Sequence, residues 1–173
     1  MNGLTNILHA LIMTILPVLM IAFQEIEMSV TIRDLLTDKG YQVYDVQPDT
    51  TLEETLRLMA EHKIGFVPVM ENGALVGVYS ERDFARMMAD REELPLSIPM
   101  RDVMVSPVYF IEADQTLQDC MAVMTAKHFR HLPVMDRGQV VGVVSIGDVI
   151  KRWILEKEFT IEQLEHLLWA NLV

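Results

Sequence analysis

The chain has 173 residues, of which 51% are hydrophobic and 23% are charged, and its net charge at pH 7 is −11. These values are typical of one globular domain or two small ones and exclude a disordered chain. The acidic balance argues against nucleic acid as the main partner, because phosphate backbones are bound by clustered Lys and Arg. Cys120 is the single cysteine, which excludes an intrachain disulfide and a cysteine metal cluster and fits a reducing cytoplasm.

The first 27 residues differ from the rest of the chain, because residues 1–24 contain no Lys, Arg, Asp or Glu. This uncharged length is enough to cross a bilayer. A spanning helix here would be interrupted by four polar or helix-breaking residues, namely Asn2, Asn6, His9 and Pro17. A signal peptide would need a basic start and a small-residue cleavage site, and neither is present. We interpret residues 1–27 as an apolar extension of a cytoplasmic protein. It results from an upstream translation start or is an appended helix. The alternatives are membrane contact through residues 1–23 and a signal.

Two segments of the chain are copies of one unit. With a shift of 65 residues, residues 43–88 align with residues 108–153 without a gap. The identical pairs include Pro68 and Pro133, Gly77 and Gly142, Ser80 and Ser145, and Asp83 and Asp148. Two copies are too few for a solenoid, which needs at least three stacked repeats. The alignment therefore predicts a pseudo-symmetric pair of units packed together.

Each copy begins with a predicted strand and helix. The strands, "QVYDV" and "PVYFI", are rich in β-branched and aromatic residues. The residues Asp49-Thr50 and Asp114-Gln115-Thr116 then offer helix N-caps. Apolar residues recur at helical spacing after these caps, namely Leu52, Leu56 and Met59 in the first copy and Leu117, Met121 and Met124 in the second.

Each copy continues with two strands and a second helix. The segments "FVPVM" and "HLPVM" are predicted strands whose proline marks an edge or an interruption of the ladder. Tight hairpin turns at residues 72–73 and 137–138 lead into the apolar strands "ALVGVYS" and "QVVGVVS". Helices then begin at Ser80 and Ser145, and "ADREELPLSIPM" links the copies. The predicted fold class is α/β (α+β), with two pseudo-symmetric β-α-β-β-α repeats packed as a pair.

The C-terminal tail is predicted to form a helix of its own. Thr160 with Gln163 resembles a capping box. Apolar residues recur at helical spacing after it, namely Ile161, Leu164, Leu168 and Leu172. We expect this helix to contribute to a homodimer contact, and the alternative is a helix packed on its own chain.

The two copies resemble the CBS domain family, named for cystathionine β-synthase, and more closely the small stand-alone bacterial proteins made of two such domains. The matching segments are "RDLL" and "RDVM", "VYDVQPDTTL" and "VYFIEADQTL", "IGFVPVMENGALVGVYSERDF" and "FRHLPVMDRGQVVGVVSIGDV", and "EKEFTIEQLE" in the tail. The resemblance covers residues 28–166. The resulting division is an extension at 1–27, CBS domains at 28–90 and 100–155, a linker at 91–99 and a C-terminal helix at 156–173.

The resemblance implies a Bateman module, in which two CBS domains face each other and bind adenosine-containing ligands in the clefts between them. Across the family these ligands include AMP, ATP, ADP, NAD(H) and S-adenosylmethionine. Such modules usually form homodimers, and many stand-alone members have no known catalytic role. The prediction is a non-enzymatic sensor of an adenine nucleotide, with no required cofactor and an unidentified protein partner that responds. The alternative is a structural dimerisation scaffold whose clefts are vestigial.

The Ser80-x-x-Asp83 and Ser145-x-x-Asp148 segments are candidates for two roles. A serine followed three residues later by an acid resembles a capping box, which needs no ligand to explain it. A helix N-terminus also offers free N–H groups and a positive dipole end to a phosphate, and a carboxylate can accept hydrogen bonds from ribose hydroxyls. In the family this stretch is the ribose and phosphate motif. We therefore predict that each turn is both a cap and a ribose clamp.

By analogy with the family, the stretches before the two prolines contact the adenine. These candidate residues are Ile64, Gly65, Phe66 and Val67 in the first copy and Phe129, Arg130, His131 and Leu132 in the second. We assign Gly65, Phe66 and Arg82 to the first cleft, and Arg130, His131 and Gly147 to the second. Arg82, Arg130 and His131 are candidate phosphate donors, and the alternative for Arg82 is a solvated side chain beside Glu81.

The sequence predicts no metal site and no catalytic residue. His128 and His131 have metal-ligand spacing only if both lie on one helix, and we expect a helix end and a strand instead. Cys120 lies inside a predicted helix and is expected to be packed. A P-loop, a Rossmann fingerprint and a Ser-His-Asp arrangement are all missing from the sequence.

Overall fold

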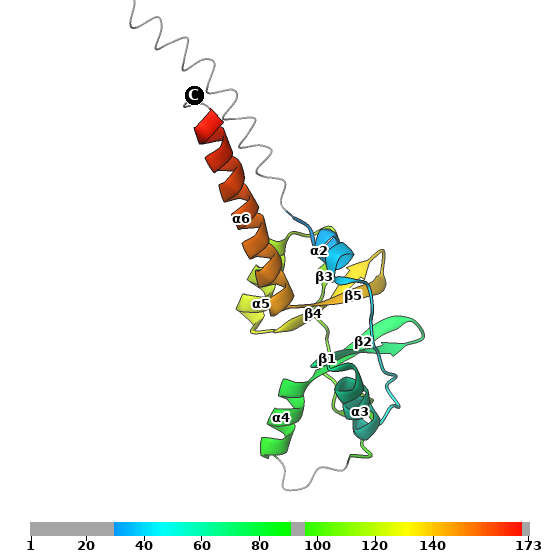
Figure 1. Cartoon of the computed structure of the whole chain (residues 1–173). Helices are drawn as coiled ribbons and strands as arrows, with labels where there is room; N and C mark the ends of the chain where they lie inside the picture. Colours follow the sequence, from blue (N-terminus) through cyan, green and yellow to red (C-terminus); the bar gives the residue numbers. More distant parts are fainter. Residues whose placement is uncertain (1–29, 91–95, 171–173) are drawn as a thin grey trace, which may run out of the picture. The chain divides into compact units, whose positions relative to one another are not determined.

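The structure is a computed structural model that describes residues 30–90 and 96–170, whose elements are shown in Figure 1. The first repeat contains α3 (Leu52–His62), β1 (Phe66–Glu71), β2 (Ala74–Ser80) and α4 (Glu81–Asp90). The second contains β3 (Ile111–Glu112), α5 (Leu117–Lys127), β4 (His131–Asp136), β5 (Gln139–Ser145) and α6 (Ile146–Ala170). The helix α2 (Ile32–Lys39) precedes the first repeat and the short 3-10 helix η1 (Met100–Asp102) precedes the second. This arrangement confirms the predicted fold class.

Threonine side chains determine where the first helix of each repeat begins. Thr51 and Thr116 are the N-caps of α3 and α5, and each forms a capping box with the acid three residues later, Glu54 or Asp119. The cap of α3 is therefore Thr51, one residue after the predicted pair Asp49-Thr50. The Thr50 hydroxyl instead accepts a hydrogen bond from the Gln47 N–H, 3.0 Å long, in the preceding turn.

The hairpins of the two repeats have the same register. Phe66 pairs with Ser80 in β1 and β2, and His131 pairs with Ser145 in β4 and β5. The turn residues 72–73 and 137–138 all have φ between 49° and 80°, as the predicted tight turns require. Both ladders shift register at the residues just after the proline. Because β4 is the middle strand of the sheet β3-β4-β5, its proline marks an interruption and not an edge.

The first strand of each repeat is much shorter than predicted. "QVYDV" contributes a single bridge, between Val46 and Val69, and "PVYFI" contributes only Ile111 to β3. Val46 and Ile111 are buried, whereas Tyr109 is 46% exposed. Tyr109 and Phe110 therefore lie on the surface and Tyr44 is half-buried, and only the last residue of each segment is buried under the hairpin.

The segment before each repeat packs on the other repeat. The Ile32 N–H at the start of α2 donates to the Gln115 carbonyl of the second repeat, at 2.9 Å. The Met100 N–H in η1 donates to the Thr50 carbonyl of the first repeat, at 2.8 Å. In Figure 1, α2 lies beside the sheet of the second repeat. Packing order therefore differs from sequence order, and a residue near 35 can reach a site built from residues near 145.

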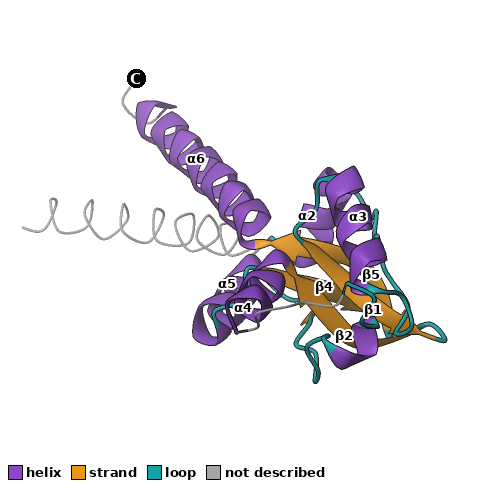
Figure 2. Ribbon diagram, turned by 90° about the horizontal axis from the view of Figure 1, so that it is seen from below, coloured by secondary structure: helices purple, strands orange, loops and turns teal. Residues whose placement is uncertain are grey.

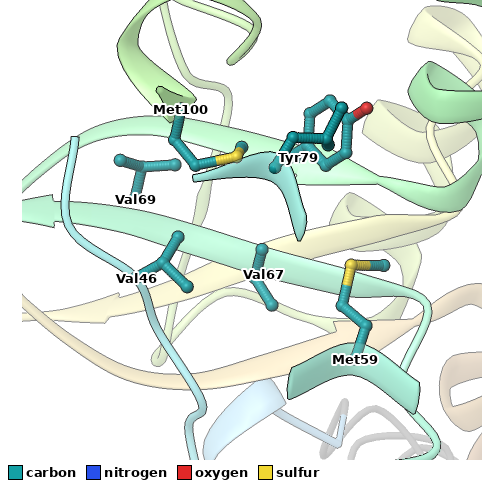
Figure 3. Close-up of a cluster of buried hydrophobic side chains, with 7 residues drawn as sticks. Val46, Met59, Val67, Val69, Tyr79 and Met100 are labelled. Atoms are coloured by element: carbon teal, nitrogen blue, oxygen red, sulfur yellow. The ribbon is translucent and has the colours of Figure 1, made fainter. Parts of the chain in front are cut away.

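Residues 31–152 form one compact unit that contains both repeats. Strands β2 and β5 contact each other, and helices surround the strands of both repeats (Figure 2). The core of the first repeat is a cluster of buried side chains, shown in Figure 3: Val46, Leu52, Met59, Val67, Val69, Tyr79 and Met100. Buried residues at matching positions of the second repeat include Ile111, Leu117, Met124, Leu132, Val134 and Val144. The repeats thus keep separate cores and meet through their hairpins.

The last helix corrects the prediction of a separate tail helix. Helix α6 is continuous over 25 residues, and Thr160 lies in its interior, where its hydroxyl donates to the Glu156 carbonyl at 2.9 Å. No glycine or proline follows Gly147 in this helix, so nothing in the sequence ends it at the predicted boundary. None of the described helices is long and apolar enough to cross a membrane. The interpretations of residues 1–27 concern a segment outside the described residues.

Candidate functional site

Both Ser-x-x-Asp turns are capping boxes. The Ser80 N–H donates to Asp83 Oδ2 at 3.1 Å, and the Asp83 N–H donates to Ser80 Oγ at 3.4 Å. The same two bonds between Ser145 and Asp148 measure 2.8 Å and 3.2 Å. In both turns the serine hydroxyl also donates to Oδ2 of the aspartate. The capping half of the prediction is therefore confirmed for both repeats.

A cavity of about 350 Å³ opens beside the first of these turns. Its lining comes from both repeats: Gly65, Phe66, Val78, Ser80, Glu81, Arg82, Asp83 and Arg86 from the first, and Val105, Pro107, Tyr109, Lys127, His128, Phe129, Arg130, His131, Leu132 and Pro133 from the second copy and the segment before it. This volume is within the range of small-molecule sites. Around Asp83, the hydrogen bonds found in the described part of the chain use Oδ2, which leaves Oδ1 for a ligand.

The charges around this cavity differ from those of the whole chain. Four cationic side chains line it, namely Arg82, Arg86, Lys127 and Arg130. Two carboxylates, Glu81 and Asp83, oppose them. In a chain whose net charge is −11, a cavity with an excess of cations is suited to an anion. Arg82 Nη1 also donates to the His128 carbonyl at 2.9 Å, which ties the start of α4 to the end of α5.

Aromatic rings supply flat walls. The Tyr109 and Phe129 rings lie 5.4 Å apart with an interplanar angle of 44°, and Lys127 Nζ lies 4.8 Å from the centre of the Tyr109 ring. The Phe66 and His131 rings, one from each repeat, stack at 5.3 Å. Burial, and then the nearby charge of Lys39, lower the pKa of His131, which favours a neutral imidazole at pH 7.

The cavity brings together nine of the predicted ligand residues: Gly65, Phe66, Ser80, Arg82, Asp83, Phe129, Arg130, His131 and Leu132. Four others are not in its lining, namely Ile64, Val67, Ser145 and Asp148. Val67 is fully buried in the core, and Ile64 packs against that core. Arg130 and His131, which the sequence analysis assigned to the second cleft, line this cavity together with Asp83, and the His131 ring stacks on the Phe66 ring at the start of β1.

Tyr109 and Lys127 were missed by the sequence analysis, although the repeat contained a signal for them. A shift of 65 residues pairs Tyr109 with Tyr44 and Lys127 with His62. In the first repeat the Tyr44 and His62 rings stack at 3.7 Å. An aromatic residue paired with a basic residue at the end of the following helix is thus a feature of both repeats, and could have identified the cavity wall.

The second turn has a different neighbour. Lys39 Nζ, at the end of α2, lies 2.5 Å from Asp148 Oδ2. Burial alone would raise the pKa of Asp148, but the hydrogen bonds from Lys39 and Ser145 outweigh burial and lower it. Sequence order concealed this pair, because α2 precedes the first repeat and packs on the second.

The described residues offer little for metal or thiol chemistry. Within residues 30–90 and 96–170, no group of three or more His, Cys, Asp or Glu side chains is placed to hold a metal ion. His128 caps the end of α5 and His131 begins β4, as predicted. Cys120 is buried, and burial raises the pKa of its thiol to about 12, so it stays protonated.

Comparison with known proteins identifies the family. The family model of the CBS domain matches residues 32–90 and 100–154. The CBS domain-containing protein YhcV of Bacillus subtilis is 30% identical over 119 residues, which cover 69% of this chain and 82% of that protein.

Two solved structures show the same architecture. The CBS-domain containing protein ATU1752 from Agrobacterium tumefaciens is similar with a TM-score of 0.68 and 34% identity, over 71% of this chain and 98% of that one. CBSX2, solved in complex with AMP, shares the fold with a TM-score of 0.59 and 23% identity, over 73% of this chain and 98% of that one. The matched segments coincide with the two repeats of the structure, and the chain therefore belongs to the CBS domain family, with two such domains in tandem.

Proposed function

We propose that this chain is a regulatory module that binds a phosphate-bearing adenine nucleotide in the cavity beside Asp83. The observation that carries the proposal is the composition of this cavity, where two carboxylates, among them Asp83, and four cationic side chains surround about 350 Å³. The complex of CBSX2 with AMP supports the same ligand class, since that protein shares the fold.

Each part of a nucleotide has a partner in this cavity. Asp83 Oδ1 can accept hydrogen bonds from the ribose hydroxyls, and such charge-assisted bonds are stronger than neutral ones. The phosphates lie near the N-terminus of α4, where free N–H groups and Arg82 attract anions. The adenine packs between the aromatic walls and the backbone that precedes the prolines, around Phe66 and His131.

The charge balance selects among the ligands of the family. Four cations against two carboxylates favour ligands with several negative charges. S-adenosylmethionine carries a sulfonium cation, which these side chains repel. We expect ATP, ADP and AMP to bind more tightly than S-adenosylmethionine, with NAD(H) limited by the space for its second nucleoside.

The module acts as a sensor and not as a catalyst. The cavity contains a hydrogen bond between the repeats, from Arg82 to the His128 carbonyl. A ligand that competes for Arg82 would bind one arrangement of the repeats more tightly than the other. Such differential affinity is what a ligand needs to shift a conformational equilibrium and so signal to a partner.

A calorimetric screen of the full chain tests the proposal. ATP, ADP, AMP, NADH and S-adenosylmethionine are titrated separately, and melting temperatures are recorded at saturation, because a ligand that binds only the folded state raises stability. The expected result is heat and a raised melting temperature with the phosphate nucleotides. If none of the ligands binds, the clefts are vestigial and the chain is a structural scaffold.

The proposed assembly is a homodimer to which α6 contributes. Large apolar side chains on this helix are exposed, among them Phe159 (62%) and Trp169 (72%). Exposed apolar side chains gathered in one region typically mark a contact with a partner. Truncation after Glu156 should lower the mass measured by light scattering without changing nucleotide affinity, because the cavity lining ends at Pro133. An unchanged mass would show that these residues do not hold a dimer.

A further inference from the structure

The two Ser-x-x-Asp turns differ in whether the carboxylate is already neutralised. Lys39 Nζ donates to Asp148 Oδ2 at 2.5 Å and to the Val143 carbonyl at 2.9 Å. In the part of the chain that the structure describes, no salt bridge involves Asp83. The same motif is therefore open to a ligand in one repeat and engaged by the chain itself in the other.

Lys39 comes from an insertion in the segment before the first repeat. When "RDLL" is aligned with "RDVM", Leu36 corresponds to Met104. Six residues then separate Leu36 from Val43, whereas only three separate Met104 from Val108. The extra residues form the last turn of α2, which ends at Lys39. The segment before the second repeat has no equivalent of this turn, since η1 ends at Asp102.

Packing supports this alignment. An added Cβ at Gly142 would lie 2.7 Å from the Leu36 side chain. An added Cβ at Gly77, the matching glycine of the first repeat, would clash with the Met104 side chain. Leu36 and Met104 therefore occupy equivalent places, and the lysine three residues after Leu36 is a feature of one side only.

In the second repeat the Lys39 ammonium takes the place of a backbone N–H donor. In the first repeat the Val105 N–H donates to the Val78 carbonyl at 2.8 Å. The matching carbonyl of the second repeat, that of Val143, accepts from Lys39 Nζ instead. Two acceptors thus hold the ammonium beside the carboxylate, and three donors use Asp148 Oδ2, namely the Ser145 N–H, the Ser145 hydroxyl and Lys39 Nζ.

We propose that Lys39 closes the second cleft to adenine nucleotides, so that each chain binds one nucleotide, beside Asp83. The inference rests on the proposed function. Among the described residues the hydrogen bonds to Asp148 use Oδ2, as those to Asp83 do, so the two turns differ in the ammonium that already neutralises Asp148. A ribose diol gains less from a neutralised carboxylate, and one that displaced Lys39 would put neutral hydroxyl donors in place of a charged one. Lys39 is thus a residue that determines which of the two clefts is available.

Calorimetric titration of AMP into the full chain tests the inference. AMP is used because it has the same ribose as ADP and ATP but the smallest phosphate charge. The parent chain should bind one AMP, and Lys39→Met should bind a second, weaker one. Asp83→Asn should weaken the first site about ten- to a hundredfold, and adding Lys39→Met to it should open the site beside Asp148. Arg33→Met is the matched control, since it removes another ion pair from α2 to the second repeat, with Asp136 at 2.9 Å, and should leave one site.

The outcomes separate the two proposals. If the parent chain binds no nucleotide, the proposed function is wrong. If it binds one AMP and Lys39→Met shows no second event at a concentration a hundredfold above the first Kd, the role of Lys39 is wrong while the function stands. Lys39→Gln repeats the test if the Met variant does not fold. A crystal structure of the parent chain saturated with AMP is independent of any variant, and AMP beside Asp148 would overturn the inference.

Discussion

The two Ser-x-x-Asp turns of this protein share a motif but differ in their surroundings. Ser80 with Asp83 and Ser145 with Asp148 make the same capping hydrogen bonds. Asp83, however, faces a cavity lined by cations, and Asp148 bonds to Lys39. The difference shows that both copies of the motif keep the helix cap, which depends only on residues within the turn. The ligand environment is not preserved, because its walls come from the other repeat and from the segment before it.

The cations themselves are unequally distributed. With the 65-residue shift, Arg82 corresponds to Gly147 and Arg130 to Gly65. Lys127 corresponds to His62. Two of the four cations around the first cavity therefore have glycine counterparts, so charge and the Lys39 contact both favour the first turn for the proposed nucleotide.

The largest expected effect is a difference between the two aspartates. Asp83→Asn should weaken AMP and ATP binding by about ten- to a hundredfold, since a charge-assisted hydrogen bond contributes about 1.5–3 kcal/mol. Asp148→Asn should leave affinity within about twofold, a change of about 0.4 kcal/mol. Calorimetric titration measures both, with Asp119→Asn as a control because this residue has the same place in the capping box of α5. Equal losses for Asp83→Asn and Asp148→Asn would mean that both clefts bind.

The next effect concerns charge. Arg130→Ala should weaken ATP binding about tenfold and adenosine binding little, because adenosine has no phosphate for the guanidinium. Lys151→Ala serves as the control, since Lys151 corresponds to Arg86 in the 65-residue shift, is not in the cavity lining and should change neither affinity. An equal loss for ATP and adenosine would assign Arg130 to the packing of the cavity wall.

A smaller effect should be the same in both repeats. Ser80→Ala and Ser145→Ala each remove a helix cap and should lower the free energy of unfolding by about 1 kcal/mol. Their effect on nucleotide affinity should be slight, because the ribose partner is the aspartate. Urea unfolding followed by circular dichroism checks the first statement, and titration checks the second. Unequal stability losses would show that the turns differ as caps as well as in their surroundings.

The sequence predicted the features that depend on neighbours along the chain. The two repeats, the hairpin turns at residues 72–73 and 137–138 and the Ser-x-x-Asp caps all follow from local spacing, and the structure confirms them. Nine of the predicted ligand residues line one cavity. These parts were accessible because turn and cap chemistry involve residues at most a few positions apart.

The features that sequence could not supply depend on contacts between distant segments. The sequence placed Arg130 with the second turn, whereas it lines the cavity beside the first, where the starts of β1 and β4 meet through the stacked Phe66 and His131 rings. Lys39 was missed because α2 precedes the first repeat in sequence but packs on the second. Thr160 resembled a cap and lies inside a helix, since a local capping signal does not end a helix whose neighbours continue it.

The smallest expected effect is on stability in acid. Hydrogen bonds from Lys39 and Ser145 lower the pKa of Asp148 although burial opposes them. Its folded pKa is thus below the unfolded value of about 3.9, so the unfolded chain binds more protons in this range. The stabilisation is present above about pH 4 and is lost as the pH falls through the folded pKa.

The comparison of parent and Lys39→Met chains isolates the contribution of the lysine. Both partners are partly exposed, with side-chain exposures of 39% for Lys39 and 30% for Asp148, so the difference in the free energy of unfolding at pH 7 should not exceed about 1 kcal/mol. Urea unfolding from pH 7 to pH 2 should show this difference disappear once Asp148 is protonated. A difference that stays constant with pH would show that Lys39 acts by packing. The pair can contribute this little to folding and still distinguish the two turns, because a nucleotide beside Asp148 would meet a carboxylate that Lys39 neutralises, whereas among the described residues no salt bridge neutralises Asp83.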